Sequence, residues 1–205
     1  VADAQVKARG RIKADTCLIV DKSGSMSVGI EVGKAIAGTI SPVCSGKLYV
    51  YAVDTMPYKI TAKEHTVEGW NTAFKGIRDG GGTIISSVLT WMMKSNEVVE
   101  QIVIVSDQGE QSPWFSAVYE EYCKKFNVKP RVVFVNCGHF TNVMEQRVAA
   151  KGADVSSFNV GNTTDYYSLP GLVDLLSKGS RLDLLMEIMG TELPERKKSN
   201  ELVVA

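Results

Sequence analysis

The sequence lacks the features that mark several classes of protein. Its 23 basic and 23 acidic residues cancel, so no net charge draws the whole chain toward nucleic acid or an anionic membrane. No apolar run approaches the roughly 18 residues that a membrane-spanning helix needs, and the first residues show no signal-peptide pattern. The two histidines, His65 and His139, have no suitably spaced metal-binding neighbour. We therefore expect neither a membrane partner nor a histidine-based metal site.

Cysteine is also scarce. The four cysteines form neither a CxxC metal pair nor a dense disulfide framework: Cys17, Cys44, Cys123 and Cys137. We expect buried free thiols in a reducing cytosol, and hence a cytoplasmic protein. The remaining composition, 44% hydrophobic and 22% charged, is typical of a globular protein. A start at Val1 rather than Met leaves open an origin as a piece of a longer protein.

Short apolar runs alternate with longer amphipathic stretches. Runs without polar alternation are typical of strands covered on both faces, and they occupy Thr16–Val20, Lys47–Val53, Gln101–Ser106, Arg131–Asn136 and, more weakly, Ala153–Val160. A short edge strand is expected at Tyr58–Thr61. Helix-like patterns cover residues 29–43, 66–77, 84–95, 113–126, 141–150, 169–178 and 181–189, and Pro113 suits the first turn of its helix.

This alternation predicts an α/β fold: a doubly wound, mainly parallel six-stranded sheet with helices on both faces. We expect the strand order 3-2-1-4-5-6. The chain then divides into an N-terminal extension (residues 1–15), the α/β domain (16–190) and a flexible C-terminal tail (191–205).

Oxygen-bearing side chains follow the strands where a doubly wound sheet binds its ligands, at the carboxyl ends. Asp21, Ser23 and Ser25 follow the first run, Thr83 follows three glycines, and Asp107 follows the third run. This all-oxygen set suits Mg²⁺ or Mn²⁺ and does not suit zinc or copper. Because three of the five donors are neutral hydroxyls, the cation would stay electrophilic and could accept a carboxylate from another molecule. The alternative is that the first three residues merely end a strand and cap a helix.

Glycines are expected to shape the loops of this site. Gly24 would allow a tight backbone path between the serines, and Gly80, Gly81 and Gly82 would let the loop bearing Thr83 approach closely.

Asp-x-Ser-x-Ser after a first strand, a Thr after glycines, and an Asp ending the fourth strand resemble the metal-ion-dependent adhesion site, or MIDAS, of von Willebrand factor A domains. The resemblance spans about residues 16–176 and implies a sheet with one short antiparallel edge strand. It also implies Mg²⁺ (or Mn²⁺) bound by Asp21, Ser23, Ser25, Thr83 and Asp107. An acidic side chain of a protein partner would complete the coordination, which makes the chain a non-enzymatic, cation-dependent protein-binding module.

A narrower resemblance suggests an alternative function. Residues 51–57, 81–83, 103–110 and 122–130 resemble the A-domain half of Ro-type (TROVE) proteins. Those proteins carry a ring of helical repeats that binds misfolded and small noncoding RNAs, and this chain contains no such ring. It would then be a component of a Ro-type ribonucleoprotein, with RNA as a partner only through that assembly. We interpret the basic cluster as a solvated helix end rather than as a nucleic-acid patch. Its members are Lys124, Lys125, Lys129 and Arg131.

Catalytic interpretations fit less well. A triad of Ser23 or Ser25, Asp107 and His139 has the chain order of a serine hydrolase, but the GxSxG elbow is absent because Asp21 stands in place of its first glycine. The P-loop and GxGxxG patterns are absent too. We therefore expect no enzymatic activity.

The remaining residues of interest receive plainer interpretations. Asp54 and Glu110 are expected to be solvated surface carboxylates, and Lys22 to point away from the ion. Trp70, Trp91 and Phe115 are expected in the core, whereas Met26 and Trp114 stay open between core packing and an apolar collar for a partner.

Overall fold

A six-stranded sheet forms the centre of the computed structural model, which describes residues 11–161, 169–178 and 189. Its strands are β1 (Thr16–Asp21), β2 (Leu48–Val53), β3 (Pro57–Ile60), β4 (Gln101–Ser106), β5 (Arg131–Cys137) and β6 (Val155–Gly161). They lie in the order β3-β2-β1-β4-β5-β6, and only the β2–β3 pair is antiparallel. The predicted order, the mainly parallel sheet and the antiparallel edge strand are confirmed.

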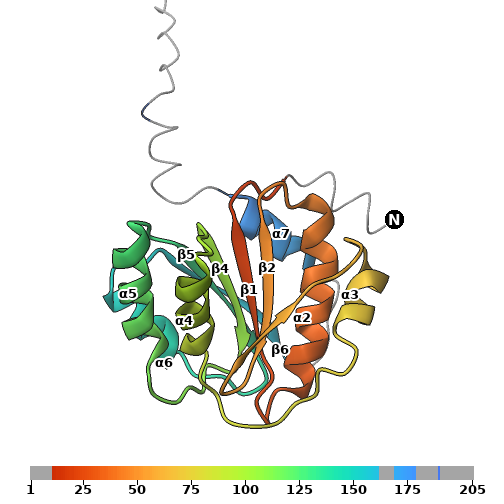
Figure 1. Cartoon of the computed structure of the whole chain (residues 1–205), viewed down its shortest axis with the longest axis horizontal. Helices are drawn as coiled ribbons and strands as arrows, with labels where there is room; N and C mark the ends of the chain where they lie inside the picture. Colours follow the sequence, from red (N-terminus) through yellow and green to blue (C-terminus); the bar gives the residue numbers. More distant parts are fainter. Residues whose placement is uncertain (1–10, 162–168, 179–188, 190–205) are drawn as a thin grey trace, which may run out of the picture.

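Helices cover both faces of this sheet. They are α2 (Ser27–Ile40), α3 (Val67–Ala73), α4 (Ser86–Ser95), α5 (Phe115–Phe126), α6 (Val143–Ala150) and α7 (Leu169–Ser177), with a 3₁₀ turn, η1, at Ser41–Val43. Figure 1 shows α2 and α3 on one side of the sheet and α4, α5 and α6 on the other. Side chains of α7 join the core that α2 and α3 form with the sheet.

The alternation of β1 builds the two cores. Leu18 and Val20 pack toward α2 on one face, and Cys17 and Ile19 pack toward α4 and α5 on the other. Every residue of β1 and β4 is buried, as expected for central parallel strands. These two strands are neighbours in the sheet, so the loops that follow them leave the same edge side by side.

Two local expectations are wrong. Pro113 is not in the first turn of a helix, because α5 begins at Phe115 and Pro113 lies in the preceding turn, after a cis peptide bond from Ser112. Trp91 is 49% exposed, because Val88, Leu89 and Met92 form the buried side of α4.

Other core predictions are confirmed. Trp70 and Phe115 are buried as expected, and the indole N–H of Trp70 donates to Ser41 Oγ at 2.7 Å. Met26, which the sequence left open between core and collar, lies in the core.

All four cysteines are free thiols, but only Cys17 and Cys137 are buried; Cys44 and Cys123 are half-buried, so the expectation of buried thiols is wrong for these two. None of the helices in the described ranges has the length and apolar character required to cross a membrane.

Parts of the predicted organisation lie outside the described residues. These are the first ten residues of the N-terminal extension, the C-terminal tail (191–205) and nearly all of the expected helix at 181–189. The proposed division of the chain therefore stays a prediction.

Candidate metal centre

Asp21 ends β1 as a fully buried carboxylate. Its Oδ1 accepts the backbone N–H of Ser23 at 2.8 Å, and its Oδ2 accepts the hydroxyl of Ser106, at the end of β4, at 2.8 Å. Burial raises the pKa of Asp21, these hydrogen bonds partly oppose the rise, and the negative charge of Asp107 adds to it. The carboxylate is thus held in one orientation and destabilised as an anion, a condition that a bound cation would relieve.

Asp107 lies just beyond β4 and faces the same loop. Its Oδ2 accepts the hydroxyl of Ser25 at 2.8 Å, and its Oδ1 accepts the backbone N–H of Gly109 at 2.9 Å. Its carbonyl accepts the N–H of Thr141 from the loop before α6, at 3.1 Å. The loops after β1, β4 and β5 therefore converge on this residue.

Backbone hydrogen bonds place the loop that carries Thr83 beside these residues. Gly80 N–H donates to Lys22 O at 2.8 Å, and Ile84 N–H donates to Asp54 O at 2.7 Å. The carbonyl of Thr83 accepts the N–H of Gln111, which follows Asp107 along the chain, at 2.7 Å. The Thr83 segment thus lies between the end of β2 and the Asp107 loop.

Backbone conformation requires glycine at position 81 of this loop, whereas a side chain at Gly82 would only displace the end of the exposed Gln111 side chain, and Gly24 has no such constraint. Gly81 has a φ of +81°, and a Cβ there would lie 3.2 Å from Asp54 Cβ. A Cβ at Gly82 would lie 2.6 Å from Gln111 Oε1. Gly24 has no left-handed φ, and a Cβ added to it would meet no atom within 4 Å. The expected role of Gly24 in a tight backbone path therefore has no support in its φ or in its contacts.

Two further carboxylates near the centre are already paired. Asp54 Oδ2 lies 2.6 Å from Lys22 Nζ, and Glu110 Oε1 lies 3.3 Å from Arg147 Nη1. Asp54 is 8% exposed and the side chain of Glu110 is 2% exposed, so the expectation of solvated carboxylates is wrong for both. The reason is that each carboxylate pairs with a lysine or arginine side chain that is distant in the sequence.

Asp21 and Asp107 differ from Asp54 and Glu110 in the partners of their carboxylates. Within the part of the chain that the structure describes, no lysine, arginine or histidine forms an ion pair with either carboxylate. They are instead bound by serine hydroxyls, which leave the negative charges uncompensated.

Gln108 is a residue that the sequence did not single out. It is 2% exposed, has a φ of +64°, and its N–H donates to Ser106 Oγ at 2.9 Å. Its amide donates to Asn136 Oδ1 at 2.8 Å and accepts the N–H of Glu145 at 3.1 Å. Asn136 in turn donates to Asn159 Oδ1 at 2.9 Å. One signal for this network was in the sequence: polar Ser106 and Asn136 end runs that are otherwise apolar.

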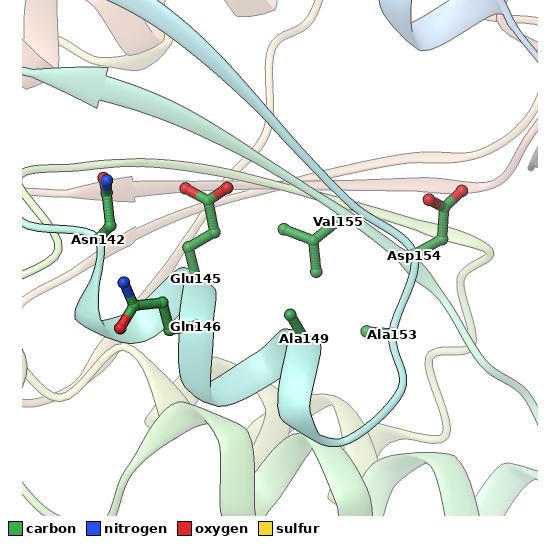
Figure 2. Close-up of a pocket in the computed structure, with 7 residues that line it drawn as sticks. All are labelled: Asn142, Glu145, Gln146, Ala149, Ala153, Asp154 and Val155. Carbon is green, nitrogen blue, oxygen red and sulfur yellow. The ribbon is translucent and has the colours of Figure 1, made fainter.

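A separate cleft of about 370 Å³ lies beside α6 and the start of β6 (Figure 2). Glu145 and Asp154 are the acidic residues among its lining, and Glu145 Oε1 accepts the hydroxyl of Ser157 at 2.5 Å. None of the five predicted ligands lines it, so the candidate centre is a feature of the sheet edge and not of this cleft.

Comparisons with known proteins rest on structure alone, since no protein-family model and no curated protein matches the sequence. Proximal thread matrix protein 1 from the mussel byssus, with a zinc-occupied MIDAS motif, is 14% identical with a TM-score of 0.58, covering 82% of this chain and 48% of that chain. A von Willebrand factor type A protein from Catenulispora acidiphila is 12% identical with a TM-score of 0.58, covering 80% and 42%. This chain has the von Willebrand factor A fold. The Ro protein of Deinococcus radiodurans shares the A fold at 15% identity and a TM-score of 0.56, covering 81% and 35%.

The chain spans about half the length of the mussel protein that it matches. On this A fold, the structure brings Asp21, Ser23, Ser25 and Asp107 together at the carboxyl ends of β1 and β4, with the Thr83 loop alongside. Within the described ranges no cluster of three or more His, Cys, Asp or Glu residues could hold a metal. The predicted set has only two such residues and depends on hydroxyls for the rest. Its chemistry, two unpaired carboxylates with neutral oxygens, fits a hard divalent cation.

Proposed function

We propose that this A domain is a divalent-cation-dependent protein-binding module. Asp21, Ser23, Ser25, Thr83 and Asp107 would hold Mg²⁺ or Mn²⁺, which when bound supplies a Lewis-acidic site for a carboxylate of a protein partner. One observation carries the proposal. Ser25 hydrogen-bonds to Asp107, and neither the Asp107 carboxylate nor the Asp21 carboxylate has a cationic partner among the described residues. Two buried or half-buried anions at one sheet edge are stabilised most directly by a cation.

In such a site, some residues of the chain would orient the ligands and others would face the partner. Ser106 and the Ser23 N–H hold the Asp21 carboxylate from within, because Asp21 and Ser23 are buried. Ser25 is exposed and Asp107 is partly exposed, so the side of the centre that they form is open to a partner. The zinc-occupied MIDAS motif of the mussel protein supports a divalent cation on this fold.

We propose that the domain has no enzymatic activity and works in the cytoplasm. Ser25 donates directly to Asp107, and within the described part of the chain His139 forms no hydrogen bond with either serine of the suggested triad. The serines therefore lack the base that a hydrolase needs. The four free thiols support a reducing compartment.

Similarity to the Deinococcus Ro protein favours a second candidate function, a component of a Ro-type ribonucleoprotein. The basic cluster gives direct RNA binding little support. Arg131 is 9% exposed and donates to Leu175 O, Lys178 O and Ser156 Oγ, while Lys124 pairs with Glu120 at 3.0 Å. A gel shift with structured small RNA at low salt tests this alternative, and no retardation would exclude direct RNA binding by the chain.

Calorimetric titration with Mg²⁺ and Mn²⁺ tests the main proposal. Wild-type protein should give a binding heat, and Asp21→Ala and Asp107→Asn should give none. Asp79→Ala, which removes an exposed carboxylate from the Thr83 loop, is the matched control and should keep the heat. Circular dichroism checks that each variant is folded. Equal heats in wild type and both site variants, or no heat in the wild type, would contradict a cation site here.

A further inference from the structure

The loop between Asp107 and α5 carries an exposed tryptophan that the fold holds in place. Trp114 is 41% exposed, and the guanidinium carbon of Arg147 lies 4.0 Å from the centre of its ring. This is a close cation–π stack. An exposed indole held against a second side chain has little freedom left to lose when a partner covers it.

A buried carboxylate anchors both members of the stack. Glu110 Oε1 pairs with Arg147 Nη1 at 3.3 Å, and Glu110 Oε2 accepts the N–H of Phe115, the first residue of α5, at 2.8 Å. One carboxylate thus fixes the arginine above the ring and the helix start that follows Trp114. Rigid, accessible tryptophan and arginine side chains are the residue types that dominate protein interfaces.

The stack belongs to the same edge as the candidate metal centre. Asp107, Glu110 and Trp114 share one loop, and α6, which bears Arg147, is tied to that loop through Thr141 N–H to Asp107 O at 3.1 Å. Three more exposed apolar side chains occupy this carboxyl edge, which lies at the bottom of Figure 1: Val28 (37%) in the first turn of α2, Met56 (63%) between β2 and β3, and Val143 (43%) at the start of α6.

We propose that this rim, formed by Val28, Met56, Trp114, Val143 and Arg147 around the candidate centre, binds a protein segment in which an acidic residue is flanked by apolar side chains. The inference rests on the proposed function, because the acidic residue would reach the cation. Charge complementarity identifies the occupant: a cation at the centre would attract a carboxylate, and Arg147, 38% exposed although paired with Glu110, places no negative charge at the rim. The apolar members of the rim favour a peptide over a nucleic acid, which would bring phosphates but no aliphatic side chains.

The probe is a phage-displayed library of random dodecapeptides with one fixed central aspartate, selected on the full chain in Mg²⁺. Enriched peptides are synthesised and their affinities measured by fluorescence polarisation for wild type, Trp114→Ala and Trp91→Ala. Trp91 is the matched control, since it is a tryptophan of similar exposure, 49%, on α4 and outside the rim.

Enriched peptides should carry an apolar residue next to the fixed aspartate. Trp114→Ala should weaken them roughly tenfold or more, as expected of an interface anchor. Trp91→Ala should leave the affinity within about twofold of wild type, the error of a neutral surface change. Arg147→Lys keeps the charge but not the planar stack, so the loss should be about three- to fivefold.

Two results would overturn the inference. Either no peptide is enriched, or the enriched peptides bind Trp114→Ala as tightly as wild type. A titration of wild-type protein with Mg²⁺ alone reports separately on the proposed function. If either result is found while Mg²⁺ gives a normal binding heat, only the inference about the rim is wrong. If Mg²⁺ gives no heat and EDTA does not affect peptide binding, both the inference about the rim and the proposed function are wrong.

Discussion

The hydroxyl of Ser25 donates to a carboxylate oxygen of Asp107 at 2.8 Å and so joins two residues that are 82 positions apart in the chain. The contact exists because β1 and β4 are adjacent parallel strands, although β2 and β3 lie between them in sequence. The candidate centre is therefore complete only when the middle of the sheet has formed, and cation binding should stabilise the whole fold.

Ser25→Ala should weaken cation binding and with it the stabilisation that the cation provides. At a Mg²⁺ concentration 100 times the wild-type Kd, the free energy of unfolding should rise by about 2.7 kcal/mol for wild type. A tenfold weaker variant would gain about 1.4 kcal/mol less. Urea denaturation with Mg²⁺ or with EDTA measures both. Ser27→Ala, at an exposed serine two residues further on, is the control, and an equal loss in that variant would contradict a specific role for Ser25.

The ion pair between Asp54 and Lys22 should make stability depend on pH. Burial by itself would raise the pKa of Asp54, but the hydrogen bond and charge of Lys22, helped by the Met56 N–H, lower it below the usual value of about 3.9. A lowered folded-state pKa contributes stability above the unfolded-state pKa, and this contribution is lost as pH falls through the folded-state value. Asp54→Asn should therefore cost roughly 1–3 kcal/mol at pH 7.

The cost of Asp54→Asn should shrink as the pH falls below about 4. Urea denaturation of both proteins between pH 3 and pH 7 measures this. Asp79→Asn, which alters an exposed carboxylate in the same region, should show no such trend. A constant difference at all pH values would show that the charge of Asp54 is not the cause.

The sequence predicted the central sheet and the members of the site because both depend on local patterns. The runs that became β1 and β4 have continuous apolar middles without polar alternation, a pattern typical of a central strand covered on both faces. Once those strands are placed, Asp21, Ser25 and Asp107 must leave the same edge. Their role as metal ligands stays a prediction.

The pairings around the site could not be predicted, because they depend on residues far apart in the chain. Glu110 is buried with Arg147 of α6 and the Phe115 N–H as its partners, and no spacing in the sequence relates Glu110 to Arg147. Trp91 lies among Val88, Leu89 and Met92, and a small difference in helical phase decides whether the indole faces the core or the solvent. The exposure of Trp114 could not be predicted either, because it depends on where α5 begins.

Gln108→Ala should destabilise the domain by about 1–3 kcal/mol, because the buried Asn136 Oδ1 and the Glu145 N–H would lose their partners. Gln108→Gly distinguishes the side-chain contribution to stability from the backbone contribution. Glycine adopts the left-handed φ without strain, whereas this conformation costs other residues about 1–2 kcal/mol. We expect Gln108→Gly to be about 1–2 kcal/mol more stable than Gln108→Ala in urea, because both lose the side chain and only glycine relieves the backbone. Gln146→Ala, at an exposed glutamine on α6, is the control. Wild-type stability in Gln108→Ala would contradict a stabilising role for the Gln108 side chain.

Gly33→Ala should destabilise the domain although alanine favours helices. A Cβ at this position of α2 would lie 2.5 Å from Val20 Cγ2, on a buried central strand. Overpacking costs about 1–3 kcal/mol, which exceeds the gain of up to about 1 kcal/mol in helix propensity. Thermal unfolding measures the net change, with Gly24→Ala as a nearly neutral control because its Cβ meets no atom. A more stable Gly33→Ala would mean that α2 can shift away from β1.

Arg131 has a consequence for shortened versions of the protein. Its guanidinium, at the start of β5, donates to the carbonyls of Leu175 and Lys178 and so fastens the end of α7 to the edge of the sheet opposite the candidate centre. A chain cut before Leu175 would strip two acceptors from an almost buried cation and uncover the apolar side of α2. Any minimal fragment prepared for binding studies should therefore extend through Lys178.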